Sequence, residues 1–169
     1  MKIKNILLFF LTAALLLAGC TSVIPRDVLS KVDEPVSIRD VQDHPDSFSA
    51  SRVLWAGIIL DIQNSKDHTI IEVLQKPSDY QGRPKAVDTS DGRFLARYNG
   101  FLDPAVYSEG REVTIAGELE GIKNLSIGEY AYTYPFVLVT EIHLWPLEPD
   151  KEYHYFHYPA YYHDRWRYW

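Results

Sequence analysis

Cysteine is almost absent from this 169-residue chain, which contains one copy, Cys20. A single cysteine cannot form a disulfide within the chain, so the fold must be stabilised by its apolar core. Basic residues are also in the minority, with 17 Lys and Arg against 23 Asp and Glu, and they are scattered along the sequence. This distribution does not favour a nucleic-acid partner, which needs a clustered basic surface.

The N-terminus has the layout of a secretory signal. Lys2 and Lys4 precede an apolar run over residues 6–18, which is too short for a membrane span of roughly 20 residues. The run ends in Leu17-Ala18-Gly19-Cys20, which resembles the bacterial lipobox, where a diacylglyceryl group is attached to the cysteine thiol and cleavage precedes that cysteine. The alternative is an ordinary signal with an incidental cysteine. Because Cys20 has no possible disulfide partner, we predict a signal peptide over 1–19 and lipidation of Cys20.

The lipid on Cys20 is the only cofactor that we expect. Each acyl chain adds roughly 0.8 kcal/mol of membrane affinity per buried CH₂, so a multiply acylated cysteine is a permanent anchor. Thr21 follows the cysteine, whereas in lipoprotein families an Asp at this position usually signals retention in the inner membrane. By this resemblance, we expect the protein to be anchored in the outer membrane and to face the periplasm.

The mature chain of 150 residues is long enough for one domain with a real core. We predict a lipidated tether over 20–36, a folded domain over 37–149 and a separate tail over 150–169. Alternating or β-branched runs predict five main strands, at residues 52–62, 69–75, 92–98, 111–120 and 135–145. Capping patterns predict short helices at 37–43 and 103–108.

Gly57 and Gly117 interrupt two of the long predicted strands, as a bulge or a sharp bend would. With five strands, and a short helix between the third and the fourth, the order is that of a mainly β, five-stranded OB-like Greek-key barrel. A generic β-sandwich is the alternative fold.

Several short motifs resemble the Slp family of outer-membrane lipoproteins, which are associated with starvation and stationary phase in Gram-negative bacteria. The matching segments are Gly82-Arg83-Pro84, 88–94, 100–104, Tyr107, Gly110-Arg111, 113–117, 127–130 and Tyr134-Pro135. The resemblance extends from the lipobox to Trp145. It implies an outer-membrane lipoprotein, and it implies no catalytic mechanism.

Asp88, Asp91 and Asp103 flank the most motif-rich stretch, and two of them would form an acid–base pair in a hydrolase. Aspartates also initiate turns and cap helices, and we favour that role here. Three arginines lie beside glycines and would clamp an anionic ligand or pair with these aspartates: Arg83, Arg93 and Arg111. Of the two roles we favour the internal pairing, and we expect no enzyme.

The C-terminal tail is the strongest local anomaly of the sequence. Residues 153–169 contain nine aromatic side chains, three histidines and two arginines. Tyrosine, tryptophan and arginine suit a membrane surface, a lipopolysaccharide or a protein partner, and the same side chains would also cover the barrel. The histidines His154, His157 and His163 are weak evidence for a metal, and we predict none. The candidate contact residues are Arg93, Tyr161, Tyr162, Arg165, Trp166, Arg167 and Trp169.

These features predict an outer-membrane lipoprotein with a structural or stress-related role in the cell envelope, acting by binding rather than catalysis. The alternative is a periplasmic module that binds glycan or lipid on the barrel face. Expected partners are the outer membrane through the lipid anchor and, through a surface of the protein, lipopolysaccharide, peptidoglycan or another envelope protein.

We expect Cys20→Ala to abolish lipid attachment and membrane retention, because the thiol that carries the acyl chains is removed. Metabolic labelling with a radioactive fatty acid, followed by membrane fractionation, measures both properties. A labelled, membrane-bound Cys20→Ala protein would contradict the anchor.

Overall fold

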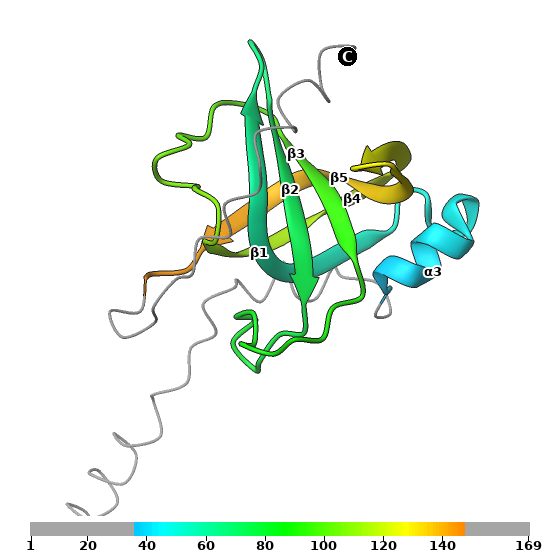
Figure 1. Ribbon diagram of the computed structural model, residues 1–169, viewed down its shortest axis with the longest axis horizontal. Helices are drawn as coiled ribbons and strands as arrows, with labels where there is room; N and C mark the ends of the chain where they lie inside the picture. Colours follow the sequence, from blue (N-terminus) through cyan, green and yellow to red (C-terminus); the bar gives the residue numbers. More distant parts are fainter. Residues whose placement is uncertain (1–35, 148–169) are drawn as a thin grey trace, which may run out of the picture.

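The structure is a computed structural model that describes residues 36–147, within which five strands form one closed barrel (Figure 1). The strands are β1 (Arg52–Asn64), β2 (Thr69–Lys76), β3 (Arg93–Tyr98), β4 (Glu112–Ile127) and β5 (Tyr130–Leu144). Their order around the barrel is β1-β2-β3-β5-β4, and β4 closes it on β1. All neighbours are antiparallel except β3 and β5. This Greek-key arrangement confirms the OB-like barrel.

The two glycines that interrupt the predicted strands lie where β1 and β4 cross from one neighbour to the next. Gly57 pairs with both Gln75 and Val113. A Cβ at Gly57 would collide with the Leu74 carbonyl oxygen, and a Cβ at Gly117 would collide with the carbonyl oxygen of Leu138. A bulge between Ala116 and Gly117 marks the bend in β4. Glycine is therefore required here because the neighbouring backbone occupies the space of a side chain.

The barrel interior is filled by apolar side chains from every strand. The largest members of this core include Trp55, Ile59, Phe94, Ile115 and Val137, each at most 6% exposed. The Trp55 and Phe94 rings meet edge to face at 5.1 Å. Close packing of this kind supplies the stability that a chain without disulfides needs.

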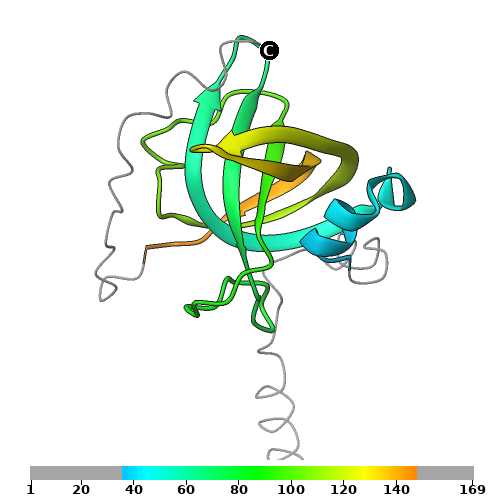
Figure 2. The ribbon, with the colours of Figure 1, turned by 45° about the vertical axis from the view of Figure 1, so that its right-hand side comes forward.

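The helix α3 (Ile38–Asp43) closes one end of the barrel, as Figure 2 shows, and it continues into a short 3-10 helix, η1 (Pro45–Phe48). Ser37 and Asp40 form the predicted cap: the Ser37 hydroxyl accepts from the Asp40 N–H, and Asp40 accepts from the Ser37 N–H. The hydrogen bonds from Ser37 lower the pKa of Asp40. The contribution of this cap to stability is therefore present at neutral pH and is lost as the pH falls through that lowered pKa.

Two parts of the predicted secondary structure needed correction. The helix expected at 103–108 is a single turn, in which the Asp103 carbonyl accepts from the Val106 and Tyr107 N–H groups. Residues 103–106 are exposed, so this short segment lacks the packing against the core that a short helix needs. The last two strands are also longer than predicted, because β4 and β5 continue as a hairpin that turns at Gly128, whose φ is 61°.

We expect Gly117→Val to lower the free energy of unfolding by roughly 1–3 kcal/mol or more, because the new side chain would overlap the neighbouring backbone. Urea denaturation followed by fluorescence measures the change. The matched control is Glu118→Val, which places the same side chain at the next position, where it is exposed. Equal stabilities of the two variants would contradict the close approach at Gly117.

Candidate ligand-binding face

OB-fold proteins bind oligonucleotides and oligosaccharides on the face of strands 2 and 3, together with the loops between strands 1 and 2 and between strands 4 and 5. In this barrel the outer surface of β2 and β3 continues onto β5, which pairs with β3. Strand alternation places every second residue outward, between core residues such as Ile71, Val73, Phe94 and Val137. The outward residues are Ile70, Glu72 and Leu74 on β2, Arg93, Leu95 and Arg97 on β3, and Tyr134, Phe136 and Leu138 on β5. We call this set the outer face. Most of its members are apolar, whereas the outer surface of an antiparallel sheet is commonly polar.

Arg93, the candidate contact residue on the barrel, forms an internal ion pair. Its guanidinium lies 2.9 Å from the carboxylate of Glu72, whose side chain is only 3% exposed. The same Glu72 oxygen accepts a hydrogen bond from the buried Tyr134 hydroxyl, and the Tyr132 hydroxyl accepts from the Arg93 N–H. The prediction that this arginine pairs internally is confirmed, but its partner is a glutamate of β2 and not an aspartate of the loops.

Arg83 also pairs with a buried glutamate, at the start of β4. Its Nε lies 2.6 Å from Glu112, and its guanidinium lies 5.6 Å from the ring centre of Trp145. Thr114 joins the cluster by accepting from the Trp145 indole and donating to the Gly82 carbonyl. These contacts fix the long β2–β3 loop to the barrel wall, which explains the Gly82-Arg83-Pro84 motif structurally.

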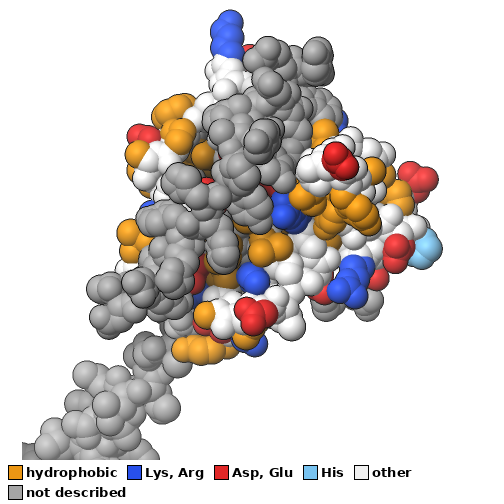
Figure 3. Space-filling view, viewed as in Figure 1, with side chains coloured by type: hydrophobic (Ala, Val, Ile, Leu, Met, Phe, Trp, Pro, Cys, Tyr) orange, Lys and Arg blue, Asp and Glu red, His pale blue; other side chains and the backbone are white. Residues whose placement is uncertain are grey.

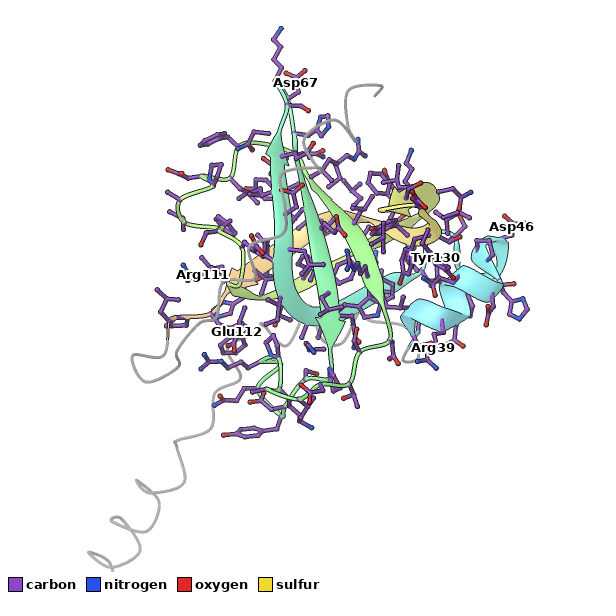
Figure 4. All side chains as sticks on the ribbon, viewed as in Figure 1. Arg39, Asp46, Asp67, Arg111, Glu112 and Tyr130 are labelled. Atoms are coloured by element: carbon purple, nitrogen blue, oxygen red, sulfur yellow. The ribbon has the colours of Figure 1, made fainter. Side chains whose placement is uncertain are left out.

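Arg111 holds two chain segments together through carbonyl oxygens. It donates to the carbonyls of Val106 and Trp145, both at 2.9 Å. Its neighbour Tyr107 packs against the core, and burial raises the pKa of this hydroxyl. Figure 4 shows Arg111 and Glu112 on the opposite side of the molecule from Tyr130 at the hairpin turn.

The three aspartates of the hydrolase alternative occupy separate loop positions. Asp91 precedes β3 and lies 4.0 Å from Arg39 in an exposed ion pair. Asp103 follows β3 and accepts from the Ala105 N–H, as a turn residue does. Asp88 lies on the exposed β2–β3 loop. Between residues 36 and 147, no group of three or more His, Cys, Asp or Glu is arranged to hold a metal ion.

Arg97 is the residue of the outer face that sequence reasoning missed. It stands between Ile70 on β2 and Leu138 on β5, and it donates to Glu120 at 2.7 Å. Its Nε is buried and has no hydrogen-bond partner within the described part of the chain. The sequence pattern could have indicated it, because Arg97 follows Leu95 by two residues on β3 and therefore lies on the same face of the strand. Figure 3 shows the hydrophobic side chains that gather beside this face where the β4–β5 hairpin lies.

The remaining candidate residues lie outside the described range. These are the lipidation site Cys20, the tail residues Tyr161, Tyr162, Arg165, Trp166, Arg167 and Trp169, and the histidines His154, His157 and His163. No helix within residues 36–147 has the length and apolar character that a membrane crossing requires.

The family profile of the outer membrane lipoprotein Slp family matches residues 17–169, which is most of the chain. The chain belongs to this family. Outer membrane protein Slp of Escherichia coli is 30% identical, over 81% of this chain and 73% of the relative. The uncharacterised lipoprotein YeaY of the same species is 30% identical, over 80% of this chain and 70% of the relative. An uncharacterised protein of Haemophilus influenzae is 31% identical, over 88% of this chain and 81% of the relative.

Solved structures with a similar strand arrangement are single-stranded DNA-binding proteins. The mitochondrial protein Rim1 of Saccharomyces cerevisiae has a TM-score of 0.36 and 12% identity, over 57% of this chain and 95% of its own. A small single-stranded DNA-binding protein from Streptomyces coelicolor has a TM-score of 0.38 and 11% identity, over 56% of this chain and 94% of its own. The fold assignment rests on the strand order described above, and the Slp family places the chain among outer-membrane lipoproteins.

We expect Arg93→Met to lower the free energy of unfolding by roughly 3–5 kcal/mol, because it removes the Arg93 cation from its ion pair with the buried Glu72 carboxylate. The double variant Arg93→Met/Glu72→Gln is expected to recover part of this loss. The control is Arg39→Met, which breaks an ion pair whose side chains are 70% and 48% exposed and is worth about 0–1 kcal/mol. Equal losses for Arg93→Met and Arg39→Met, measured by urea denaturation, would contradict the internal role of Arg93.

Proposed function

We propose that this protein is held in the outer membrane by lipid on Cys20, faces the periplasm, and acts there by binding, in a structural, stress-related role. Membership of the Slp family supports the envelope location. The described residues begin at 36, so only 15 residues lie between Cys20 and the described domain.

The observation that supports the structural role is that three arginines make contacts within the barrel itself. Arg83 and Arg93, which would clamp an anionic ligand, instead pair with buried glutamates of the same barrel. Arg111 binds two backbone carbonyls. These contacts tie the β2–β3 loop, the β3–β4 loop and the end of β5 to the wall of the barrel. A barrel whose loops are fixed by its own charges is suited to act as a rigid spacer or docking body.

The separation of the aspartates supports binding over catalysis. A general acid and a general base must both reach one substrate bond. Asp91 and Asp103 instead lie beyond opposite ends of β3, and Asp103 is engaged as a turn residue.

A second candidate function is a ligand-binding module, and Arg97 is the observation that favours it. A buried guanidinium N–H without an acceptor, flanked by Ile70 and Leu138, is suited to a ligand with an oxygen acceptor and an apolar part. Glycan and lipid both have this character.

Complementation of a Gram-negative strain that lacks the gene tests these functions. After starvation, we expect the wild-type chain to restore resistance to detergent and to exclude a hydrophobic dye, and we expect Cys20→Ala to fail although it is exported. The combined variant Asp88→Asn/Asp91→Asn/Asp103→Asn is expected to restore resistance fully, because binding needs none of these carboxylates. Full rescue by Cys20→Ala would contradict an anchored role, and loss of rescue in the Asn variant at normal protein level would revive a hydrolase.

The same experiment separates the two candidate functions through Arg97→Met. A structural role predicts rescue equal to that of wild type. A ligand-binding module predicts loss of rescue with unchanged protein level and melting midpoint.

A further inference from the structure

The outer face forms a second apolar layer on the outside of the barrel wall. Leu95 is fully buried, although strand alternation directs it outward between the core residues Phe94 and Ala96. Its cross-strand neighbours are Glu72, which is also buried, and Phe136. An apolar layer outside a closed barrel is stable in water only when further chain or a partner covers it.

Arg97 lies within this layer and has an unsatisfied donor. One terminal nitrogen binds Glu120, but its Nε is buried without an acceptor in the described residues. A buried N–H that gives up water without finding an acceptor destabilises the protein. The covering segment is therefore expected to bring an oxygen acceptor as well as apolar surface.

We propose that the cover is the C-terminal segment of this same chain, residues 148–169. The point where this segment leaves the barrel is fixed, because Arg111 binds the Trp145 carbonyl and Arg83 donates to the Pro146 carbonyl. Three cross-strand pairs lead around the barrel wall from the end of β5 to β2. Leu144 of β5 pairs with Val113 of β4, Val113 pairs with Gly57 of β1, and Gly57 pairs with Gln75 of β2. The end of β5 is thus three inter-strand spacings, or about 15 Å, from β2, which is one of the strands of the outer face.

The length of the C-terminal segment is more than sufficient for this path. It contains 22 residues, which span up to roughly 70 Å when extended. A segment of this length reaches across β2, β3 and β5, whose neighbouring strands are about 4.8 Å apart.

The composition of the segment matches the outer face in apolar surface, and its last 17 residues also match the acidic barrel in charge. Its nine aromatic side chains can each bury about 150–250 Å². Over 148–169 the segment carries three Lys and Arg against four Asp and Glu, and its positive charge is confined to the last 17 residues, 153–169, which carry two arginines and three histidines against one aspartate. Residues 36–147 carry 10 Lys and Arg against 16 Asp and Glu. Two glutamates of β4 lie beside the face: Glu118, which is exposed, and Glu120, whose carboxylate accepts from Arg97. A foreign ligand at Arg97 would then have to displace the chain's own segment.

Paired cysteines in the full-length lipidated chain test this proposal, because Cys20 is the only native cysteine and carries the lipid. Ile70→Cys on the outer face is combined with Tyr161→Cys or Trp166→Cys, and the pair is treated with a short bismaleimide. The control replaces Ile70→Cys by Asp46→Cys on η1, at the far side of α3 (Figure 4). Mass spectrometry of the linked peptides is expected to show at least fivefold more linkage to position 70 than to position 46.

Two outcomes of the cross-linking would overturn the proposal. One is an equal yield from both positions, which would mean that the segment does not select the outer face. The other is linkage found only between differently tagged copies in a mixture, which would make a second molecule the occupant.

Tryptophan fluorescence gives an independent measurement without introduced thiols. Trp55 and Trp145 are about 5% exposed, so quenching by acrylamide reports mainly on Trp166 and Trp169. We expect Leu138→Glu on the outer face to raise the quenching constant at least twofold, and Ser126→Glu on the exposed hairpin to leave it unchanged. An unchanged quenching constant in a folded Leu138→Glu protein would overturn the proposal, whatever the outcome of the complementation experiment.

Discussion

Closing five strands into one small barrel is the constraint on which the rest of this structure depends. Two long strands, β1 and β4, must each bend so sharply that a neighbouring backbone occupies the position of a side chain, and Gly57 and Gly117 make this possible. The closed wall then determines which residues face the core and which form the outer face. It also places the start of β4 and the end of β5 beside the β2–β3 loop, where Arg83 and Glu112 meet.

The elements that sequence reasoning found are those set by local pattern. The alternation in the five strands, the two interrupting glycines and the Ser37–Asp40 cap are each readable within a few residues. The sequence predicts β4 and β5 to be shorter than they are, because Gly121, Asn124 and Ser126 interrupt the apolar pattern in the part of the hairpin that extends beyond the barrel. The helix expected after Asp103 did not form, because its residues 103–106 are exposed, whereas α3, of the same length, is stabilised by burying Ile38 and Val41 in the core.

The partners of the charged residues could not be read from the sequence, because they depend on which strands become neighbours. Arg93 is 21 residues from Glu72, and Arg83 is 29 residues from Glu112. The aspartates nearest in sequence were the natural guess, yet they lie on loops, where water solvates them. Burial instead selected glutamates on strands, whose carboxylates need a cation. The role of Arg97 depends in the same way on the parallel pairing of β3 with β5.

The position of β1 has a mechanical consequence for a protein held at one end. Trp55 binds the Val36 carbonyl, so a pull on the N-terminal side reaches β1 directly. β1 is hydrogen-bonded to β4 over residues 52–58 and to β2 over residues 56–64, so such a force is resisted first by the ladder with β4 and then, where the two ladders overlap, by both. The last strand, β5, is likewise joined to β3 and β4. A load applied between Val36 and Leu144 is therefore carried from β1 to β5 through β4, along two long antiparallel ladders.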